Sequence, residues 1–426
     1  MTVKISKDPS GLTIISEMLP HVEGLSIGVY IKSGSRDETQ EEHGIAHFLE
    51  HMLFKGTSRR SAKKIGEEIE SVGGYINAYT SKEVTAYTIN ILKDDISLAV
   101  DILGDMLSNS LLDPDHINHE KDVILEEIGE TADDPWSVVY RKFSEVAWRN
   151  QVIGRSVLGT KESILSFTSD KIRAYMSRNY VADRIFIVAV GGVDHNFLVK
   201  KVEECFNIKS SSTIVRNLVP SYYVGGTEIL SRDLSEVHVM IGFLGCAYQS
   251  SDFYSSLILD NILGGGGMSS RLYQEIRERR SLCYSILSTH EAFSDNGIFY
   301  VSAATKKENL SELMFSIFEE LYRICQSVGE EEISRACAQI RARLIMGGEN
   351  PSTRAEEIAE QIMFYGNLIQ RQKIIEKLSC ITCKDITDLA SRFFWDKNPT
   401  ISALGPIETL PLTDHLTKKI SSSKTK

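Results

Sequence analysis

Two histidines and a glutamate near the start of the chain are spaced so that they could share a metal ion. His47, Glu50 and His51 form the pattern His-x-x-Glu-His. On a helix, positions i, i+3 and i+4 lie on one face, so both imidazoles and the carboxylate can point to one ion. Imidazoles suit Zn²⁺, and a glutamate that is not a ligand can take a proton from a nearby water. The pattern, an inverted zinc-peptidase motif, predicts His47 and His51 as ligands and Glu50 as the general base.

The alternative interpretation is a solvated helix face that happens to carry two histidines near a carboxylate. The neighbouring side chains argue against it because they make the helix largely apolar, and an apolar helix is typically buried. Polar groups in a buried helix need partners, and a shared metal is one. The apolar neighbours are Phe48, Leu49, Met52, Leu53 and Phe54.

A third ligand is expected from another segment, because catalytic zinc sites use three protein ligands. Asp113 and Pro114 are typical of a helix N-cap and first turn, and the helical pattern continues to about residue 132. Glu120 and Glu127 lie two turns apart on one face of this helix, which makes Glu127 a candidate ligand and Glu120 a candidate partner that orients a ligating histidine. Taken alone, these acids fit a solvated acidic helix better. The interpretation of Glu120 and Glu127 as site residues depends on their combination with the His-x-x-Glu-His helix.

Residues 47–57, His-Phe-Leu-Glu-His-Met-Leu-Phe-Lys-Gly-Thr, and residues 120–127, Glu-Lys-Asp-Val-Ile-Leu-Glu-Glu, resemble the pitrilysin (insulinase) family of zinc peptidases. The resemblance extends over nearly the whole chain and is strongest to the short two-domain branch, which includes mitochondrial processing peptidase β subunits and bacterial relatives. It implies one Zn²⁺ per chain. The implied roles are His47, His51 and Glu127 as zinc ligands, Glu50 as base and Glu120 as supporting acid.

Composition places the chain among ordinary globular proteins. Its 426 residues are too many for one compact core and fit two domains of about 200 residues each. A net charge of −11 argues against a nucleic-acid partner and mildly favours a basic substrate. No apolar run is long enough for a membrane span and the N-terminus lacks a signal pattern, so a soluble cytoplasmic protein is expected. The seven cysteines are expected to be reduced, and the Cys380 to Cys383 pair is interpreted as structural.

The second half of the chain repeats the pattern of the first. The apolar run at 237–243 matches that at 26–31, 256–264 matches the candidate metal helix, and 297–303 matches the strand near Ala86. We therefore predict an α+β fold of two duplicated domains, each a mostly antiparallel sheet packed with helices. The predicted boundaries are 1–208 for the catalytic domain, 209–226 for a linker, 227–410 for the second domain and 411–426 for a mobile tail.

The second copy lacks the candidate metal ligands. When the two halves are aligned, the second half keeps the apolar pattern but not the candidate metal ligands. The ligand set is therefore not a requirement of the fold. One zinc site, in the first domain, is expected. The counterparts of His47, Glu50, His51, Glu120 and Glu127 are Leu257, Asp260, Asn261, Ala336 and Arg343.

The segment 73–81 carries the features of a peptide-binding edge. Its paired glycines and the following Asn-Ala suggest exposed, irregular backbone at a sheet edge, where an extended peptide can add as a strand. The resemblance implies that Asn77, Ala78 and Thr80 contact substrate and that Phe54 lines the pocket after the cleaved bond. A plain turn for 73–81 and core packing for Phe54 are the alternatives.

The glycine run 264–267 precedes a helix but lacks the Lys-Ser/Thr pair of a nucleotide-binding loop, so nucleotide binding is not expected. The resemblance implies that Arg277 and Tyr284 hold the substrate carbonyl and backbone from the second domain. The alternatives are a surface charge run for Arg277 and a core position for Tyr284.

Together these observations predict a zinc metalloendopeptidase, a hydrolase that cleaves extended peptides with an activated water. Basic, presequence-like substrates are plausible because Glu130, Asp133 and Asp134 follow Glu127. The resemblance also implies a homodimer. The alternatives are a non-catalytic scaffold subunit of the same fold, which would be expected to lack ligands, and a module that binds peptides without cutting them.

Overall fold

The computed structural model describes residues 3–210, 218–395 and 398–410. The predicted tail at 411–426 and the middle of the predicted linker at 209–226 lie outside these residues. Contacts divide the chain into two compact units, each assembled from separate segments. The first unit comprises residues 1–130, 155–219 and 346–368, and the second comprises 131–154, 220–345 and 369–426.

The first unit is built on a six-stranded sheet in the order β1-β2-β6-β3-β5-β4. All neighbouring strands run antiparallel except β2 and β6, which are parallel. The strands are β1 (Val3–Lys7), β2 (Thr13–Met18), β3 (Gly24–Ile31), β4 (Tyr75–Thr80), β5 (Thr85–Leu92) and β6 (Ile185–Gly191). The helices are α1 (Ile45–Leu53), α2 (Ala62–Glu70), α3 (Ile96–Asn109), α4 (Pro114–Asp133), α6 (Lys161–Leu165), α7 (Ser169–Asn179), α8 (His195–Cys205) and α12 (Pro351–Tyr365).

The second unit repeats this plan with a five-stranded sheet in the order β7-β11-β8-β10-β9. Its single parallel pair, β7 with β11, matches the pair β2 with β6. The strands are β7 (Gly226–Ser231), β8 (Val237–Gly245), β9 (Ile286–Ala292), β10 (Gly297–Thr305) and β11 (Thr400–Gly405). The helices are α5 (Pro135–Ala147), α9 (Phe253–Asp260), α10 (Leu310–Gln326), α11 (Glu330–Gly347), α13 (Arg371–Ser379) and α14 (Cys383–Trp395). The predicted α+β fold of two duplicated, mostly antiparallel domains is confirmed.

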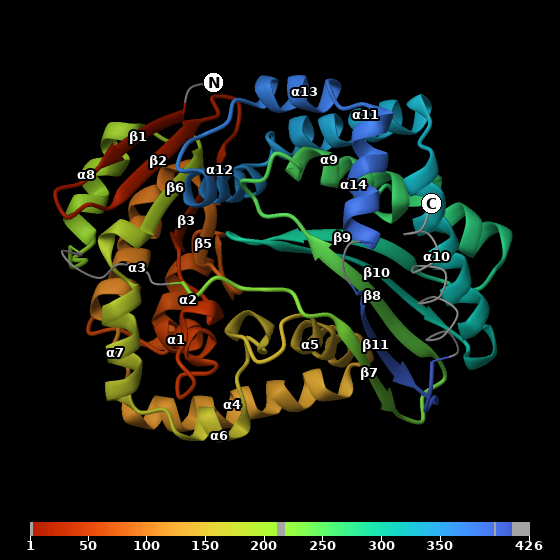
Figure 1. The fold of residues 1–426 in the computed structure, drawn as a ribbon. Coiled ribbons are helices and arrows are strands. Elements are labelled where there is room, and N and C mark those ends of the chain that lie inside the picture. The colour runs from red at the N-terminus through yellow and green to blue at the C-terminus, as the bar shows by residue number, and fades with distance from the viewer. Residues whose placement is uncertain (1–2, 211–217, 396–397, 411–426) are drawn as a thin grey trace. The chain divides into compact units, whose positions relative to one another are not determined.

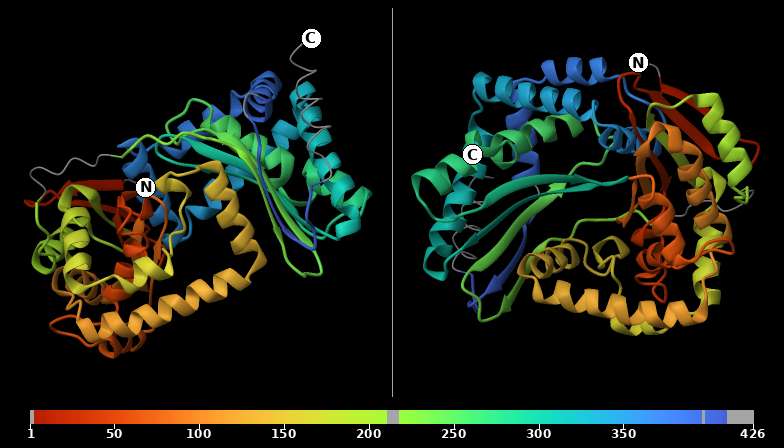
Figure 2. Two further views of the ribbon diagram at one scale, coloured as in Figure 1. Left: turned by 60° about the horizontal axis from the view of Figure 1, so that its bottom comes forward. Right: turned by 180° about the vertical axis from the view of Figure 1, so that it is seen from behind.

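Each unit includes one helix from the other half of the sequence. Helix α12 lies against β3 and β6 in the first unit, where its blue ribbon crosses red and green strands (Figure 1). Helix α5 lies against β7, β8 and β11 in the second unit, as the further views also show (Figure 2). The buried ion pair of Arg354 with Glu17, at 2.5 Å, fixes α12 to β2.

The two faces of the first sheet are covered by different helices. Alternate residues of β3, from Leu25 to Ile31, enter the main core with α1 and α3. Between them, Tyr30 points to the other face, where burial raises its pKa and two glutamates of α12 raise it further. On the core face, α1 also contacts β4, the strand at one edge of the sheet. No helix in the described part of the chain is long and apolar enough to cross a bilayer.

Candidate metal centre

Helix α1 holds the first part of the site because its apolar side chains fix it in the core. Phe48, Leu49, Met52 and Leu53 are fully buried, and each such side chain contributes about 1.5–3 kcal/mol by leaving water. The remaining face carries His47, Glu50 and His51. The burial predicted from the sequence is therefore observed.

Helix α4 brings Glu127 to the two histidines. The Nε2 atom of His47 lies 3.6 Å from one carboxylate oxygen of Glu127, and the Nε2 atom of His51 lies 3.8 Å from the other. Ligand atoms about 2.0–2.2 Å from a tetrahedral zinc ion are separated by about 3.4 Å. One donor atom from each of the three residues fits within 4.8 Å of the others, and among the described residues this is the one such group of His, Cys, Asp and Glu.

The donor chemistry of His47 also fits a metal. The imidazole is buried, and burial together with the neighbouring His51 lowers its pKa to about 3. His47 is therefore neutral at neutral pH, which is the state that can donate a lone pair. Its Nδ1 atom is buried and has no hydrogen-bond partner among the described residues. The Nε2 atom is the one that faces Glu127.

Glu120 orients His51 through the ring nitrogen that does not face the candidate metal site. The Nδ1–H of His51 donates to a carboxylate oxygen of Glu120 across 2.8 Å, which leaves the Nε2 lone pair directed to the site. The second oxygen of Glu120 accepts from Lys55 at 2.7 Å. Burial raises the pKa of Glu120, but the hydrogen bonds from His51 and Lys55 outweigh it and the pKa lies below its usual value. Lys55 lies within the segment 47–57, but the sequence alone does not predict its contact with Glu120.

Glu50 lies beside the three donors and is held by a strand. The hydroxyl of Thr80, the last residue of β4, donates to a carboxylate oxygen of Glu50 across 2.6 Å. Burial raises the pKa of Glu50, and the Thr80 hydrogen bond opposes the rise. Thr80 was predicted to contact substrate, whereas the observed contact is with the candidate base.

The other residues predicted to bind substrate lie on or near β4. Segment 75–80 is a regular strand, not the irregular backbone expected from its glycines, because it pairs with β5 along its length. Its other edge has no partner strand among the described residues. Asn77 is exposed on this strand and Ala78 packs against the core. Phe54 ends α1 and lies half-buried, with its ring centroid 6.2 Å from that of Tyr87.

Arg277 and Tyr284 belong to the second unit. The Arg277 guanidinium stacks between the rings of Tyr273 and Tyr284, at 4.6 and 4.9 Å from their centroids. Tyr284 is 81% exposed, so a core position for this side chain is excluded. The two residues predicted to act together are thus in contact with each other.

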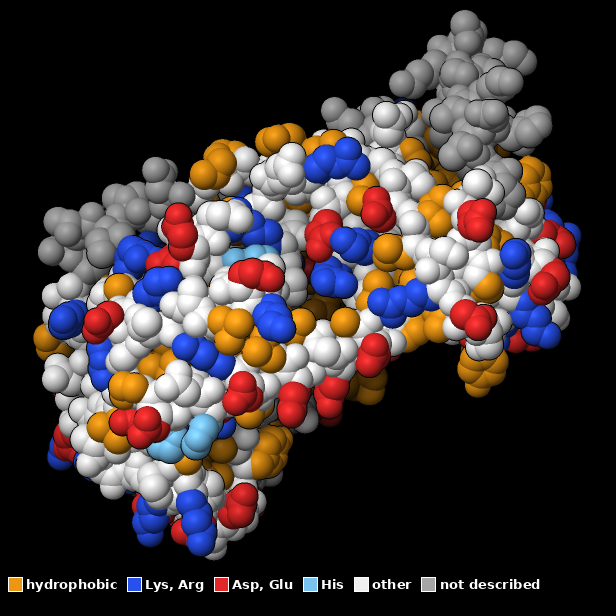
Figure 3. Space-filling model, turned by 90° about the horizontal axis from the view of Figure 1, so that it is seen from below, with side chains coloured by type: hydrophobic (Ala, Val, Ile, Leu, Met, Phe, Trp, Pro, Cys, Tyr) orange, Lys and Arg blue, Asp and Glu red, His pale blue; other side chains and the backbone are white. Residues whose placement is uncertain are grey.

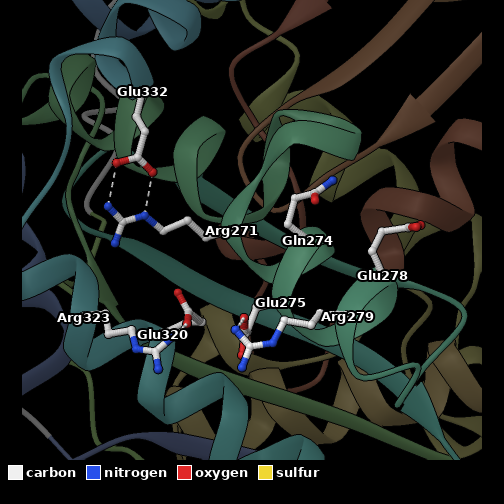
Figure 4. A pocket seen from close by; sticks show the side chains of 8 residues that line it. All are labelled: Arg271, Gln274, Glu275, Glu278, Arg279, Glu320, Arg323 and Glu332. Carbon is white, nitrogen blue, oxygen red and sulfur yellow. Dashed lines mark hydrogen bonds and ion pairs between the residues drawn. The ribbon is translucent and has the colours of Figure 1, made fainter.

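A pocket in the second unit carries no comparable chemistry. It lies beside a π-helical segment, Tyr273–Arg279, and is lined mainly by charged side chains (Figure 4). Its three guanidinium groups each pair with a carboxylate of the same pocket: Arg271 with Glu332, Arg279 with Glu275, and Arg323 with Glu320. The charges of the pocket are therefore largely compensated internally.

Comparisons with known proteins find similarity along most of the chain. Residues 13–161 match the sequence model of the insulinase family, peptidase family M16, and residues 166–340 match that of the peptidase M16 inactive domain. A protein of Rickettsia felis described as a zinc protease is 35% identical over 94% of this chain and 97% of its own length.

A probable mitochondrial-processing peptidase subunit beta of Arabidopsis thaliana is 32% identical over 96% of this chain and 79% of its own length. Among solved structures, a protease from Helicobacter pylori superposes with a TM-score of 0.90 at 21% identity, covering 95% of this chain and 99% of that one. That likeness concerns the fold. By its sequence matches, the chain belongs to the insulinase family of peptidases, family M16.

Proposed function

We propose that this chain is a zinc metalloendopeptidase that hydrolyses extended peptides. The observation that carries the proposal is the convergence of His47, His51 and Glu127 within ligand distance of one another, beside a carboxylate that is not one of the three. A bound zinc ion would polarise the scissile carbonyl and acidify the attacking water. The names of the zinc-protease relatives support the choice of metal.

In this proposal Glu50 moves the proton. The Glu50 oxygen that does not accept the Thr80 hydrogen bond takes a proton from the attacking water. At the same time the water oxygen adds to the carbonyl carbon. Glu50 then returns that proton to the amide nitrogen as the C–N bond breaks. Because Thr80 holds the other oxygen at 2.6 Å, the carboxylate is fixed before substrate arrives.

The substrate is proposed to bind as an added strand on β4. The open edge of β4 presents main-chain N–H and C=O groups, which recognise extended backbone without requiring a particular sequence. Asn77 and Ala78 would contact this strand, and Phe54 would line the pocket after the cleaved bond. Arg277 and Tyr284 are proposed to hold the substrate carbonyl, and the rings stacked on Arg277 would limit the motion of its guanidinium.

A preference for basic peptides is also proposed. Exposed acids recur along α4 at Asp122, Glu126, Glu130 and Asp133, and the face drawn in Figure 3 shows a short row of acidic side chains among Lys and Arg side chains. Burial raises the pKa of Glu127, and Glu130 lies close enough to raise it further. Asp134, by contrast, caps α5 by accepting the Ser137 N–H at 2.7 Å. A cytoplasmic location and a homodimer stay predictions.

The proposal is tested by removing and restoring metal. The full chain would be treated with a chelator, dialysed and assayed on a set of extended basic and acidic peptides, with and without added Zn²⁺. We expect cleavage to be lost on chelation, to return with about one zinc per chain, and to be faster for basic peptides. Cleavage that persists in metal-free protein would contradict the proposal.

The complete ligand set argues against the non-catalytic scaffold.

A further inference from the structure

The helix that carries the candidate ligands begins at a residue that cannot cap it. Gly44, the N-cap of α1, has φ +91°, a conformation that favours glycine. A Cβ atom there would lie 2.7 Å from both the Leu158 carbonyl oxygen and the Gly159 Cα atom. Position 44 is therefore restricted to glycine, which has no side-chain oxygen for the first-turn N–H groups.

Glu38 supplies these missing acceptors from outside the helix. One of its carboxylate oxygens accepts the Gly44 N–H at 2.9 Å and the other accepts the Ala46 N–H at 3.0 Å. Glu38 is 4% exposed, so water does not compete strongly for these bonds. A carboxylate at this end also complements the partial positive charge of the helix N-terminus.

The environment of Glu38 opposes the cost of burying its charge. Burial raises the pKa of Glu38 by more than the N–H bonds from Gly44 and Ala46 and the nearby Lys82 ammonium lower it, so the pKa is about 8. Glu42 contributes a smaller rise. Two bonded N–H groups and one ammonium favour the ionised form but offset only part of the effect of burial, and the hydrogen-bond geometry is what ties Glu38 to α1.

The segment that carries Glu38 is also attached to the end of β4. The Ser35 N–H donates to the Ser81 carbonyl at 3.1 Å, and the Arg36 N–H donates to the Lys82 carbonyl at 2.8 Å. Arg36 and Glu83 form a buried ion pair at 2.8 Å. Ser81 directly follows Thr80, so one segment contacts both the start of α1 and the strand end that holds Glu50.

We propose that Glu38 is a positioning residue: it fixes helix α1, with His47, Glu50 and His51, relative to Thr80. This inference rests on the proposed function, because the positioning matters for the zinc site and the base described there. Glu38 touches neither a donor atom of that site nor its reacting atoms. Its effect is exerted through the backbone of the first turn of α1.

The test compares two Glu38 variants with a matched control in the full chain. Glu38→Gln keeps the size of the side chain but offers one acceptor oxygen where two N–H groups need one each. Glu38→Ala removes both acceptors. Glu42→Gln is the control, because Glu42 lies in the same loop and pairs with Arg178 at 2.7 Å rather than capping α1 with its side chain.

Three quantities are measured: amide hydrogen exchange over residues 44–48, zinc affinity by competition with a chelator, and kcat and KM for peptide cleavage. For Glu38→Gln we expect about tenfold faster exchange, zinc affinity about tenfold weaker, kcat about tenfold lower and KM within about twofold of the parent. Glu42→Gln is expected to match the parent. If Glu38→Ala does not fold, Glu38→Gln decides the outcome.

The inference is overturned if Glu38→Gln exchanges, binds zinc and cleaves like Glu42→Gln. It is also overturned if Glu38→Gln and Glu42→Gln lose activity equally, because the effect would then be a general property of the loop. If the parent neither binds zinc nor cleaves, the proposed function fails, while the exchange measurement still shows whether Glu38 holds the first turn of α1.

Discussion

The hydroxyl of Thr80 and the carboxylate of Glu50 are joined by a hydrogen bond of 2.6 Å between the end of β4 and the middle of α1. β4 is an edge strand with no further partner strand among the described residues, and α1 carries two of the candidate metal ligands. The contact therefore ties the proposed base to the strand on which a peptide substrate is proposed to lie.

The first prediction concerns this contact. Replacing Thr80 by valine keeps the shape of the side chain but removes its donor, so Glu50 becomes free to rotate. We expect kcat to fall about tenfold with little change in KM and no loss of zinc. The matched control is Thr88→Val, because Thr88 lies on the neighbouring strand β5 and does not contact Glu50 in the structure. A kcat for Thr80→Val equal to that of the parent would show that the Thr80 bond has no catalytic role.

The second prediction separates Glu127 from its neighbour. Glu127 is half-buried beside both histidines, whereas Glu126 is exposed on another face of α4. Glu127→Gln removes a charged donor, and zinc content should fall to below about a tenth of an ion per chain after dialysis. Glu126→Gln should retain the parent content. Elemental analysis of both variants makes the comparison, and equal zinc in the two would remove Glu127 from the ligand set.

The third prediction concerns Lys55, whose ammonium pairs with Glu120 at 2.7 Å. Lys55→Met leaves the buried Glu120 with one fewer partner and weakens its hold on His51. Zinc affinity, measured by chelator competition, should fall about tenfold. Lys63→Met is the control, because Lys63 makes an exposed pair with Glu67 on α2. A Lys55 variant that binds zinc as tightly as this control would contradict the proposed chain from Lys55 through Glu120 to His51.

The fourth prediction concerns stability in the second unit. Burial raises the pKa of Asp260 from 3.8 to about 7, against the opposing effects of the Ser288 hydrogen bond and Arg343. An acid with a higher pKa in the folded state binds its proton more tightly there, so this group lowers stability as pH rises from about 4 to about 7. The Asp260→Asn variant avoids that penalty and keeps an oxygen for Ser288, which donates at 2.6 Å in the parent.

We therefore expect the thermal midpoint of Asp260→Asn to exceed that of the parent by about 2–4 °C at pH 8, with a smaller difference at pH 5. Asp233→Asn, which changes an exposed acid of the same unit, should show no such dependence on pH. A difference for Asp260→Asn that is independent of pH would contradict the explanation.

Local sequence patterns predicted much of the fold. Apolar runs identified β3, β8 and β10, and the Asp113-Pro114 pair marked the start of α4, where Asp113 accepts the Asp115 N–H at 2.9 Å. Helical spacing was sufficient to place His47, Glu50 and His51 on one face, because their relation is local. Glu127 was recognised through the resemblance and through its spacing from Glu120 on one helix.

What the sequence did not predict depends on contacts between distant segments. The exchange of α5 and α12 between the units involves pairs such as Glu17 with Arg354, which no local periodicity connects. The contacts of Thr80 with Glu50 and of Lys55 with Glu120 also join different elements. Segment 75–80 differs from the predicted irregular backbone, because main-chain pairing with β5 holds it as a strand and the glycines at 73 and 74 precede it.

The most direct test of the central claim is to measure zinc content and peptide cleavage in the same samples of the parent and of Glu50→Gln. Glu50 is proposed to move the proton without binding the metal, so both proteins should hold about one zinc per chain and the parent alone should cleave. A Glu50→Gln variant that still cleaves at the parent rate, or a parent that holds no zinc, would contradict the account.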